Sequence, residues 1–227
     1  MRKYKILMFD LDDTLLDFSR TEEESLKEIF KRYNVEDTQE NIDAYKKINS
    51  ALWAQLEFGN KTKDEIIVER FIEFFNIFNI DIDGAKVEEE YRNLLDDSHY
   101  MLDGAYQTLE RLYKEDYRIF AATNGLEITQ LKRMKDAKII DFFEDIFISE
   151  VIGYEKPSKE FFDYVSTNIK DFVIDETLMI GDRLSADIIG ASNYGINTCW
   201  INANDEQSDM PTYTLKTVNE IFNILDK

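Results

Sequence analysis

Two aspartates stand directly after the first apolar run of the chain, in Asp10-Leu11-Asp12-Asp13-Thr14. Residues two apart on an extended segment project to the same side, so the carboxylates of Asp10 and Asp12 can converge on one bound group. Two neighbouring carboxylates can act as nucleophile and proton carrier when their surroundings separate their pKa values. Taken alone, such an acidic segment is more often a solvated turn. A catalytic role for it therefore depends on the residues found elsewhere in the chain.

Three later segments carry side chains that suit a phosphorylated ligand. The hydroxyl of Thr123, with neighbouring N–H groups at Asn124, can bind a phosphoryl oxygen, although Thr123 can equally satisfy the donors of a turn. Lys156 offers a compact positive charge, although a lysine before a proline that starts a helix is common. Asp182 and Asp187 provide oxygen ligands of the kind that Mg²⁺ prefers; the alternative is a helix N-cap at Asp182.

Short apolar runs precede these segments, and their lack of polar alternation is typical of strands covered on both faces in a parallel sheet. The runs are 6–9, 119–122, 146–148, 178–180 and 196–201. After the first, stretches with apolar residues three and four apart indicate crossover helices at 104–114, 126–137, 159–168 and 184–194. This repeated βαβ pattern predicts an α/β fold with a doubly wound parallel sheet. The candidate residues follow four strands, whose ends would line one crevice.

The interval between the first two runs has a different pattern. It shows helical periodicity and no convincing strand, with helices expected at 21–33, 41–58, 63–78 and 85–97. We therefore expect a helical domain over residues 18–100, inserted into a core domain of residues 1–17 and 101–227.

The composition is that of a globular protein, because 44% of the 227 residues are apolar and there are only two prolines and eight glycines. The net charge of −20 disfavours binding to a nucleic-acid polymer or an anionic membrane. A small anionic substrate remains compatible with this charge if a metal ion reverses the local field.

The apolar run at 6–9 is far shorter than the roughly 20 residues that cross a bilayer, so a secretion signal is not expected. The single cysteine, Cys199, allows no internal disulfide. Both observations favour a cytoplasmic protein.

The order Asp-x-Asp-x-Thr, Thr-Asn, Lys-Pro and Gly-Asp-x-x-x-x-Asp spans the chain and resembles the haloacid dehalogenase (HAD) superfamily. The inserted helical segment is similar to the C1-type cap of that superfamily. Within it, stretches 9–18 and 181–188 are most similar to the YjjG-type pyrimidine nucleotide 5′-phosphatases. Arg183 stands where a serine is common, which affects what surrounds the metal ligands.

The resemblance implies a Mg²⁺-dependent phosphatase that works through an aspartyl phosphate. Asp10 would be the nucleophile, and Asp12 would protonate the leaving alcohol and later take a proton from water. Mg²⁺ would be held by Asp10, the backbone carbonyl of Asp12 and Asp182, with Asp187 orienting the metal's surroundings.

The phosphoryl oxygens would be held by Thr123, Asn124 and Lys156. The resemblance implies a small phosphorylated substrate, with a nucleoside 5′-monophosphate expected first. We expect the protein to be a monomer or small homo-oligomer. A sugar phosphatase, such as an acylneuraminate 9-phosphatase, shares every core residue and is the close alternative. A phosphoryl-accepting binding module is the alternative from another class, although receiver domains have no inserted helical cap.

Two residues discriminate among reactions within the superfamily. Haloacid dehalogenases lack an acid two residues after the nucleophile, so Asp12 disfavours dehalogenation. Phosphoglucomutases of this type usually carry an apolar residue where this chain has Thr14, which favours hydrolysis.

Specificity is expected to lie with the cap, which would close over the leaving group. We predict that some of its residues face the cleft, with an aromatic side chain available to stack on a base: Phe18, Asn49, Trp53 and Arg70. The alternative is equally favoured, with Trp53 and Phe18 in the cap's own core and Arg70 in an ordinary ion pair.

Overall fold

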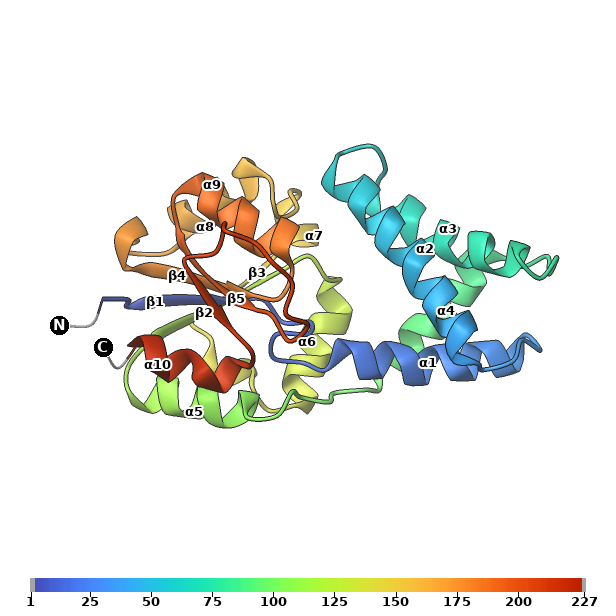
Figure 1. Ribbon diagram of the computed structural model, residues 1–227, viewed down its shortest axis with the longest axis horizontal. Helices are drawn as coiled ribbons and strands as arrows, with labels where there is room; N and C mark the ends of the chain where they lie inside the picture. The colour runs from blue at the N-terminus through green and yellow to red at the C-terminus, as the bar shows by residue number, and fades with distance from the viewer. Residues whose placement is uncertain (1–2, 226–227) are drawn as a thin grey trace. The chain divides into compact units, whose positions relative to one another are not determined.

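The computed structural model describes residues 3–225, and the chain divides into two compact units (Figure 1). The core unit comprises the described residues up to Phe18 and from His99 onward, and the helical unit comprises Ser19–Ser98. The sequence predicts an inserted domain of residues 18–100. Residues 1–2 and 226–227, which the sequence places in the core domain, lie outside the described part.

The core unit contains a six-stranded sheet in which every pair of neighbours is parallel, in the order β3-β2-β1-β4-β5-β6. The α/β fold with a doubly wound sheet is therefore confirmed. The chain runs outward from β1 to β3 on one side and from β4 to β6 on the other, so the strand order reverses at β1 and β4. The strands are β1 (Ile6–Phe9), β2 (Arg118–Thr123), β3 (Asp145–Ile148), β4 (Thr177–Gly181), β5 (Asn197–Ile201) and β6 (Tyr213–Leu215).

The sequence did not predict β6. It has three residues, Tyr-Thr-Leu, and none of them is fully buried. Because it lies at the edge of the sheet and pairs only with β5, it carries no continuous apolar run.

Helices cover both faces of the sheet, as Figure 1 shows. Alternate residues of β1 explain why: Leu7 and Phe9 pack in a cluster that includes residues of α5, and Ile6 and Met8 pack in a second cluster that includes residues of α8. All four are at most 2% exposed. The helices of the core unit are α5 (Ala105–Lys114), α6 (Glu127–Asp136), α7 (Ser149–Ile152), α8 (Lys159–Asn168), α9 (Gly190–Tyr194) and α10 (Phe222–Leu225).

One predicted crossover helix differs in detail. The stretch expected as a single helix at 184–194 begins as a π-helix, η3 (Leu184–Ile189), and continues as α9. Its wider first turns place Asp187 beside β4, and π-helical turns are often found at functional sites. Three short 3₁₀ segments complete the unit: η1 (Ile140–Phe142), η2 (Ile174–Glu176) and η4 (Val218–Ile221).

The helical unit is built around aromatic side chains from its four helices. Phe30 stacks on Phe74 with ring centroids 4.7 Å apart, and Tyr45 contacts Phe71 at 5.3 Å. The helices are α1 (Phe18–Arg32), α2 (Gln39–Glu57), α3 (Lys63–Asn76) and α4 (Gly84–Asp96), and α1 begins at the last residue of the core unit's first segment.

Across residues 3–225, no helix has both the length and the apolar character that a membrane span requires.

Candidate active site

The candidate site lies at the carboxyl ends of three neighbouring strands, β2, β1 and β4. Asp10 directly follows β1, Thr123 is the last residue of β2, and Asp182 directly follows β4. The backbone N–H of Asp10 donates to the carbonyl of Ile180 at 2.8 Å, which holds the two strand ends side by side. Open α/β sheets bind ligands at the point where the strand order reverses, and these residues stand at that point.

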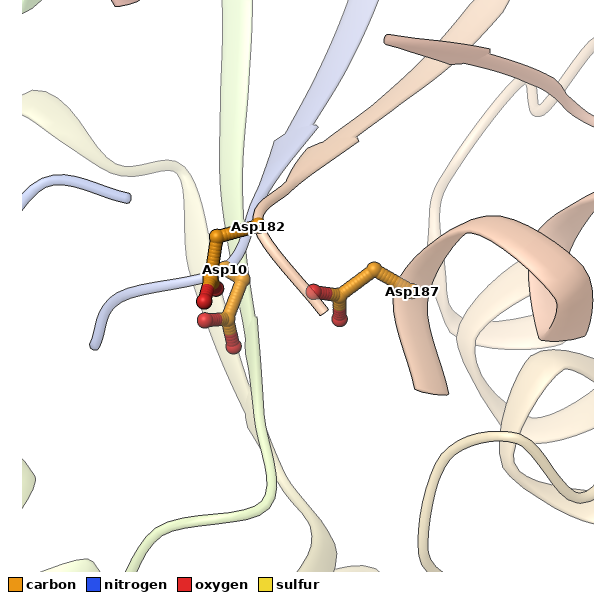
Figure 2. A group of neighbouring side chains, drawn as sticks. All are labelled: Asp10, Asp182 and Asp187. Carbon is orange, nitrogen blue, oxygen red and sulfur yellow. The ribbon is translucent and has the colours of Figure 1, made fainter. Parts of the chain in front are cut away.

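Three carboxylates meet there. Oxygen atoms of Asp10, Asp182 and Asp187 lie within 4.8 Å of one another. Figure 2 shows Asp10 and Asp182 extending from two neighbouring strand ends, with Asp187 reaching toward them from the helical segment that follows. Such a cluster of oxygen atoms suits a hard divalent cation.

Two carboxylates of this cluster, those of Asp10 and Asp182, resist ionisation. The pKa of Asp10 is raised to about 7, mainly by burial and also by the negative charges of Asp187 and Asp12, against the attraction of Lys156. Burial also raises the pKa of Asp182 well above its ordinary value, reinforced by the charge of Asp10. A bound cation would stabilise the ionised forms of both groups, so the residues present fit a metal ion.

Lys156 is the positive charge of the site. It is 1% exposed, and its Nζ donates to Asp10 at 2.7 Å, to Asp187 at 2.6 Å and to the backbone carbonyl of Ala122 at 2.6 Å. Burial lowers the pKa of this ammonium, but the charges of Asp10 and Asp187 outweigh burial and leave it above its usual value. Lys156 is therefore a permanent cation beside the first aspartate.

Asn124 holds the backbone of Lys156. Its side-chain amide donates to the carbonyl of Lys156 at 2.8 Å, and its side-chain oxygen accepts from the N–H of Lys156 at 2.9 Å. The sequence predicts Asn124 as a phosphate ligand. In the structure, both ends of its side chain are engaged in joining the loop after β2 to the loop that carries Lys156.

Asp187 joins Lys156 to the loop after β4. One carboxylate oxygen accepts from Lys156, and the other accepts from the backbone N–H of Arg183 at 3.0 Å. The two chain segments approach so closely that a Cβ at Gly181 would lie 2.2 Å from the Asp187 carboxylate. Only glycine fits at this position, and Asp187 is placed as a support for Lys156.

Most of the chain, including the helical unit, matches a known family. Residues 7–201, which carry all of these groups, match the model of the haloacid dehalogenase-like hydrolases. The chain belongs to this family.

Relatives of this HAD-like hydrolase cover nearly its whole length. The HAD-hydrolase YfnB of Bacillus subtilis is 38% identical over 100% of the chain and 97% of its own, and its magnesium-bound crystal structure superposes with a TM-score of 0.95 over 99% of the chain and 100% of its own. The pyrimidine 5′-nucleotidase PynA of Streptococcus pneumoniae is 37% identical, covering 99% of the chain and 96% of its own. The pyrimidine 5′-nucleotidase YjjG of Escherichia coli is 29% identical, covering 99% of each. Membership of a hydrolase family favours an enzyme over the phosphoryl-accepting binding module, which was the alternative from another class.

The second aspartate of this HAD-like hydrolase is held by α6. Asp12 accepts from the Nη1 of Arg133 at 2.5 Å on one carboxylate oxygen and from the amide of Gln130 at 2.6 Å on the other. Neither residue was predicted from the sequence, where the stretch 126–137 indicates only a crossover helix. The signal in the sequence is the spacing of Gln130 and Arg133, which places both side chains on one face of the helix, the face that also carries Met134.

Thr123 is oriented by the same helix. Its Oγ1 accepts from the backbone N–H of Gly125 at 3.0 Å and from Gln130 at 3.0 Å. A hydroxyl has two acceptor lone pairs and one donor, so these bonds direct the hydroxyl hydrogen elsewhere. Thr123 can therefore donate to a phosphoryl oxygen.

Two of the four predicted specificity residues meet inside the helical unit of this HAD-like hydrolase. Arg70 is 5% exposed and pairs with the carboxylate of Glu88 at 2.5 Å. Asn49 accepts from Arg70 at 3.3 Å and donates to Glu22 at 3.2 Å. The ion pair is the arrangement that the alternative interpretation describes, and a role for Arg70 and Asn49 in specificity stays a prediction.

The two aromatic candidates lie in different units. Trp53 is half-buried and packs against an apolar cluster formed by Leu52, Ile66 and Ile67. Phe18 begins α1, and its ring centroid lies 5.6 Å from the guanidinium carbon of Arg133. A role for either ring in stacking on a base stays a prediction.

Proposed function

We propose that this HAD-like hydrolase is a phosphomonoesterase that transfers the phosphoryl group of a small substrate to Asp10. The observation that carries this proposal is the position of Lys156, a buried cation 2.7 Å from the Asp10 carboxylate in the middle of an acidic cluster. A phosphate dianion needs positive charge beside the nucleophile that attacks it, and Lys156 supplies one such charge.

Mg²⁺ is the second source of positive charge in the proposal. Asp10 and Asp182, with the backbone carbonyl of Asp12, would hold it, and the raised pKa values of the two carboxylates support a cation at this place. When bound, it neutralises the repulsion between an anionic nucleophile and a phosphate dianion. The crystal structure of YfnB is described as bound to magnesium, which supports the same choice of metal here.

The chain's own residues divide the reaction into two displacements. In the first, an oxygen of Asp10 forms a bond to phosphorus as the bond to the leaving alcohol breaks, and Asp12 gives that alcohol its proton. In the second, Asp12 takes a proton from the water that attacks phosphorus, and the bond from phosphorus to Asp10 breaks. Thr123 would donate to a phosphoryl oxygen during both displacements, and Lys156, whose three donors are engaged by Asp10, Asp187 and Ala122, would stabilise the phosphoryl charge electrostatically.

The substrate that we propose is a nucleoside 5′-monophosphate, with a pyrimidine base preferred. Two relatives that span nearly the whole chain, PynA and YjjG, carry the name pyrimidine 5′-nucleotidase, and this supports the proposal. A cytoplasmic location and a monomer or small homo-oligomer stay predictions from the sequence.

A substrate panel tests this function. The purified protein is assayed for phosphate release from pyrimidine and purine nucleoside 5′-monophosphates and from sugar phosphates that include acylneuraminate 9-phosphate, with Mg²⁺ and with EDTA. We expect the highest kcat/KM for a pyrimidine nucleotide, no turnover in EDTA, and none with Asp10→Asn. A higher kcat/KM for a sugar phosphate would overturn the nucleotide assignment, and equal turnover by Asp10→Asn would overturn the nucleophile.

A further inference from the structure

We propose that Gln130 and Arg133 are positioning residues that hold Asp12 where it exchanges a proton with the leaving oxygen. This inference rests on the proposed function, in which Asp12 is the proton carrier. It assigns to α6 a role that goes beyond packing against the sheet.

The two donors fix the plane of the Asp12 carboxylate. Arg133 donates to one oxygen at 2.5 Å and Gln130 to the other at 2.6 Å. These two bonds restrict both the rotation of the side chain and the tilt of the carboxylate. Each oxygen keeps a second lone pair, and the Asp12 side chain is 29% exposed. The carboxylate is therefore held firmly on its inner side and stays open to a reacting group on its outer side.

Arg133 is an unusual residue to find at this depth if its role is only structural. Its side chain is 1% exposed, and among the described residues its Nε and Nη2 have no hydrogen-bond partner. A buried guanidinium with unsatisfied donors is unfavourable for folding, and a buried ion pair is weak evidence for stability. The carboxylate with which it pairs is that of Asp12, so the geometry points to a role in the site.

Gln130 connects Asp12 to the phosphate-binding side of the site. The same amide nitrogen donates to Asp12 and, at 3.0 Å, to the hydroxyl of Thr123. Gln130 also accepts from Arg133 at 3.3 Å, which holds its own amide in this orientation. The chain leaves room for this side chain at Gly125, where a Cβ would lie 2.3 Å from the Gln130 amide nitrogen.

The consequence is a dependence on the leaving group. An alcohol of low acidity has to be protonated as it leaves, whereas p-nitrophenolate leaves without a proton. If α6 positions Asp12, its loss should slow the transfer from benzyl phosphate much more than the transfer from p-nitrophenyl phosphate. A helix that only supported the fold would affect both substrates alike.

The test measures kcat/KM for these two substrates, with Mg²⁺, in the full-length protein and in the variants Arg133→Met, Arg133→Lys and Gln130→Leu. We expect Arg133→Met and Gln130→Leu to lose at least about tenfold more on benzyl phosphate than on p-nitrophenyl phosphate, which is part of the usual contribution of a general acid. Lys135→Met is the matched control, because it removes a positive charge from an exposed position of the same helix, and its ratio should not change.

A double-variant comparison separates positioning from any other effect. Asp12→Asn alone should show the same selective loss, and adding Arg133→Met to it should cause no further selective loss, because both act on one proton transfer. Circular dichroism measures whether each variant is folded. If Arg133→Met does not fold, the comparison is made with Arg133→Lys and Gln130→Leu.

Three results would overturn the inference: an equal loss of kcat/KM on both substrates, no loss, or a gain in kcat/KM. A gain would mean that the contact holds Asp12 in an inactive position. If the wild type is active and the variants lose kcat/KM equally on both substrates, the positioning role alone is wrong. A wild type that released no phosphate from either substrate would overturn the proposed function, and this inference with it.

Discussion

The metal-free protein should become more stable when Asp10 is replaced by asparagine, and the gain should depend on pH. Burial raises the pKa of Asp10 from its ordinary value of 3.8 to about 7. A group whose pKa is raised on folding favours the folded state fully below its unfolded pKa, and that contribution is lost as pH rises through the folded pKa. Between roughly pH 4 and pH 7, the folded protein keeps a proton on Asp10 that the unfolded chain releases.

The magnitude follows from the two pKa values. Each pH unit in this window lowers the free energy of unfolding by about 1.4 kcal/mol, so the loss approaches about 4 kcal/mol near pH 8. The asparagine side chain of the Asp10→Asn variant is neutral in both states and escapes this loss. Lys156 keeps its charge throughout the window, and Asp182 titrates in both proteins, so most of its contribution cancels in the comparison.

The assay is urea unfolding of the wild type and of Asp10→Asn in EDTA, at pH 4, 5, 6, 7 and 8. We expect nearly equal stability at pH 4 and an advantage for Asp10→Asn that grows to a few kcal/mol at pH 8. Asp209→Asn, at an exposed position, shows what the loss of one negative charge does by itself. A stability difference that stayed constant from pH 4 to pH 8 would refute the assignment of a buried, proton-retaining carboxyl to Asp10.

Three further predictions concern single residues. Asp12→Asn should lower kcat on a nucleoside monophosphate by at least roughly a hundredfold, as measured by phosphate release, because it removes the proton carrier. Gly181→Ala should destabilise the protein by about 1–3 kcal/mol in urea unfolding and reduce turnover, because its Cβ would push the Asp187 carboxylate away from Lys156. Arg70→Met should destabilise by about 1–3 kcal/mol, because the buried carboxylate of Glu88 loses one of its two arginine partners and keeps Arg92; an effect below about 1 kcal/mol in urea unfolding would contradict this.

The elements of the fold were largely predictable, because each depends on a local pattern. A strand buried on both faces has to be a continuous apolar run, and β1 occupies the same residues 6–9 that the run predicts. Helical spacing likewise located the four helices of the helical unit. The elements that were not predicted are short or irregular. They include the half-exposed strand β6, the four-residue helices α7 and α10, and the π-helix after β4, whose apolar spacing resembles that of an α-helix.

The candidate site was predictable only as a set of residue types. Strand ends of a doubly wound sheet meet at one edge, so Asp10, Thr123 and Asp182 could be expected together. The partner of each side chain could not be inferred in this way. Asn124 engages the backbone of Lys156, which is 32 residues away, and no local pattern encodes a hydrogen bond across that separation.

Periodicity and strand-end position are properties of neighbouring residues, so the α/β architecture, the helical segment and the four loops with reactive side chains can be predicted from the sequence. Which charges are buried together depends on the tertiary structure. It placed Lys156 between Asp10 and Asp187, and it brought Arg133 from α6 onto Asp12, 121 residues earlier in the chain. The physical reason is that burial and charge pairing depend on how the helices pack on the sheet, and packing is a property of the whole chain.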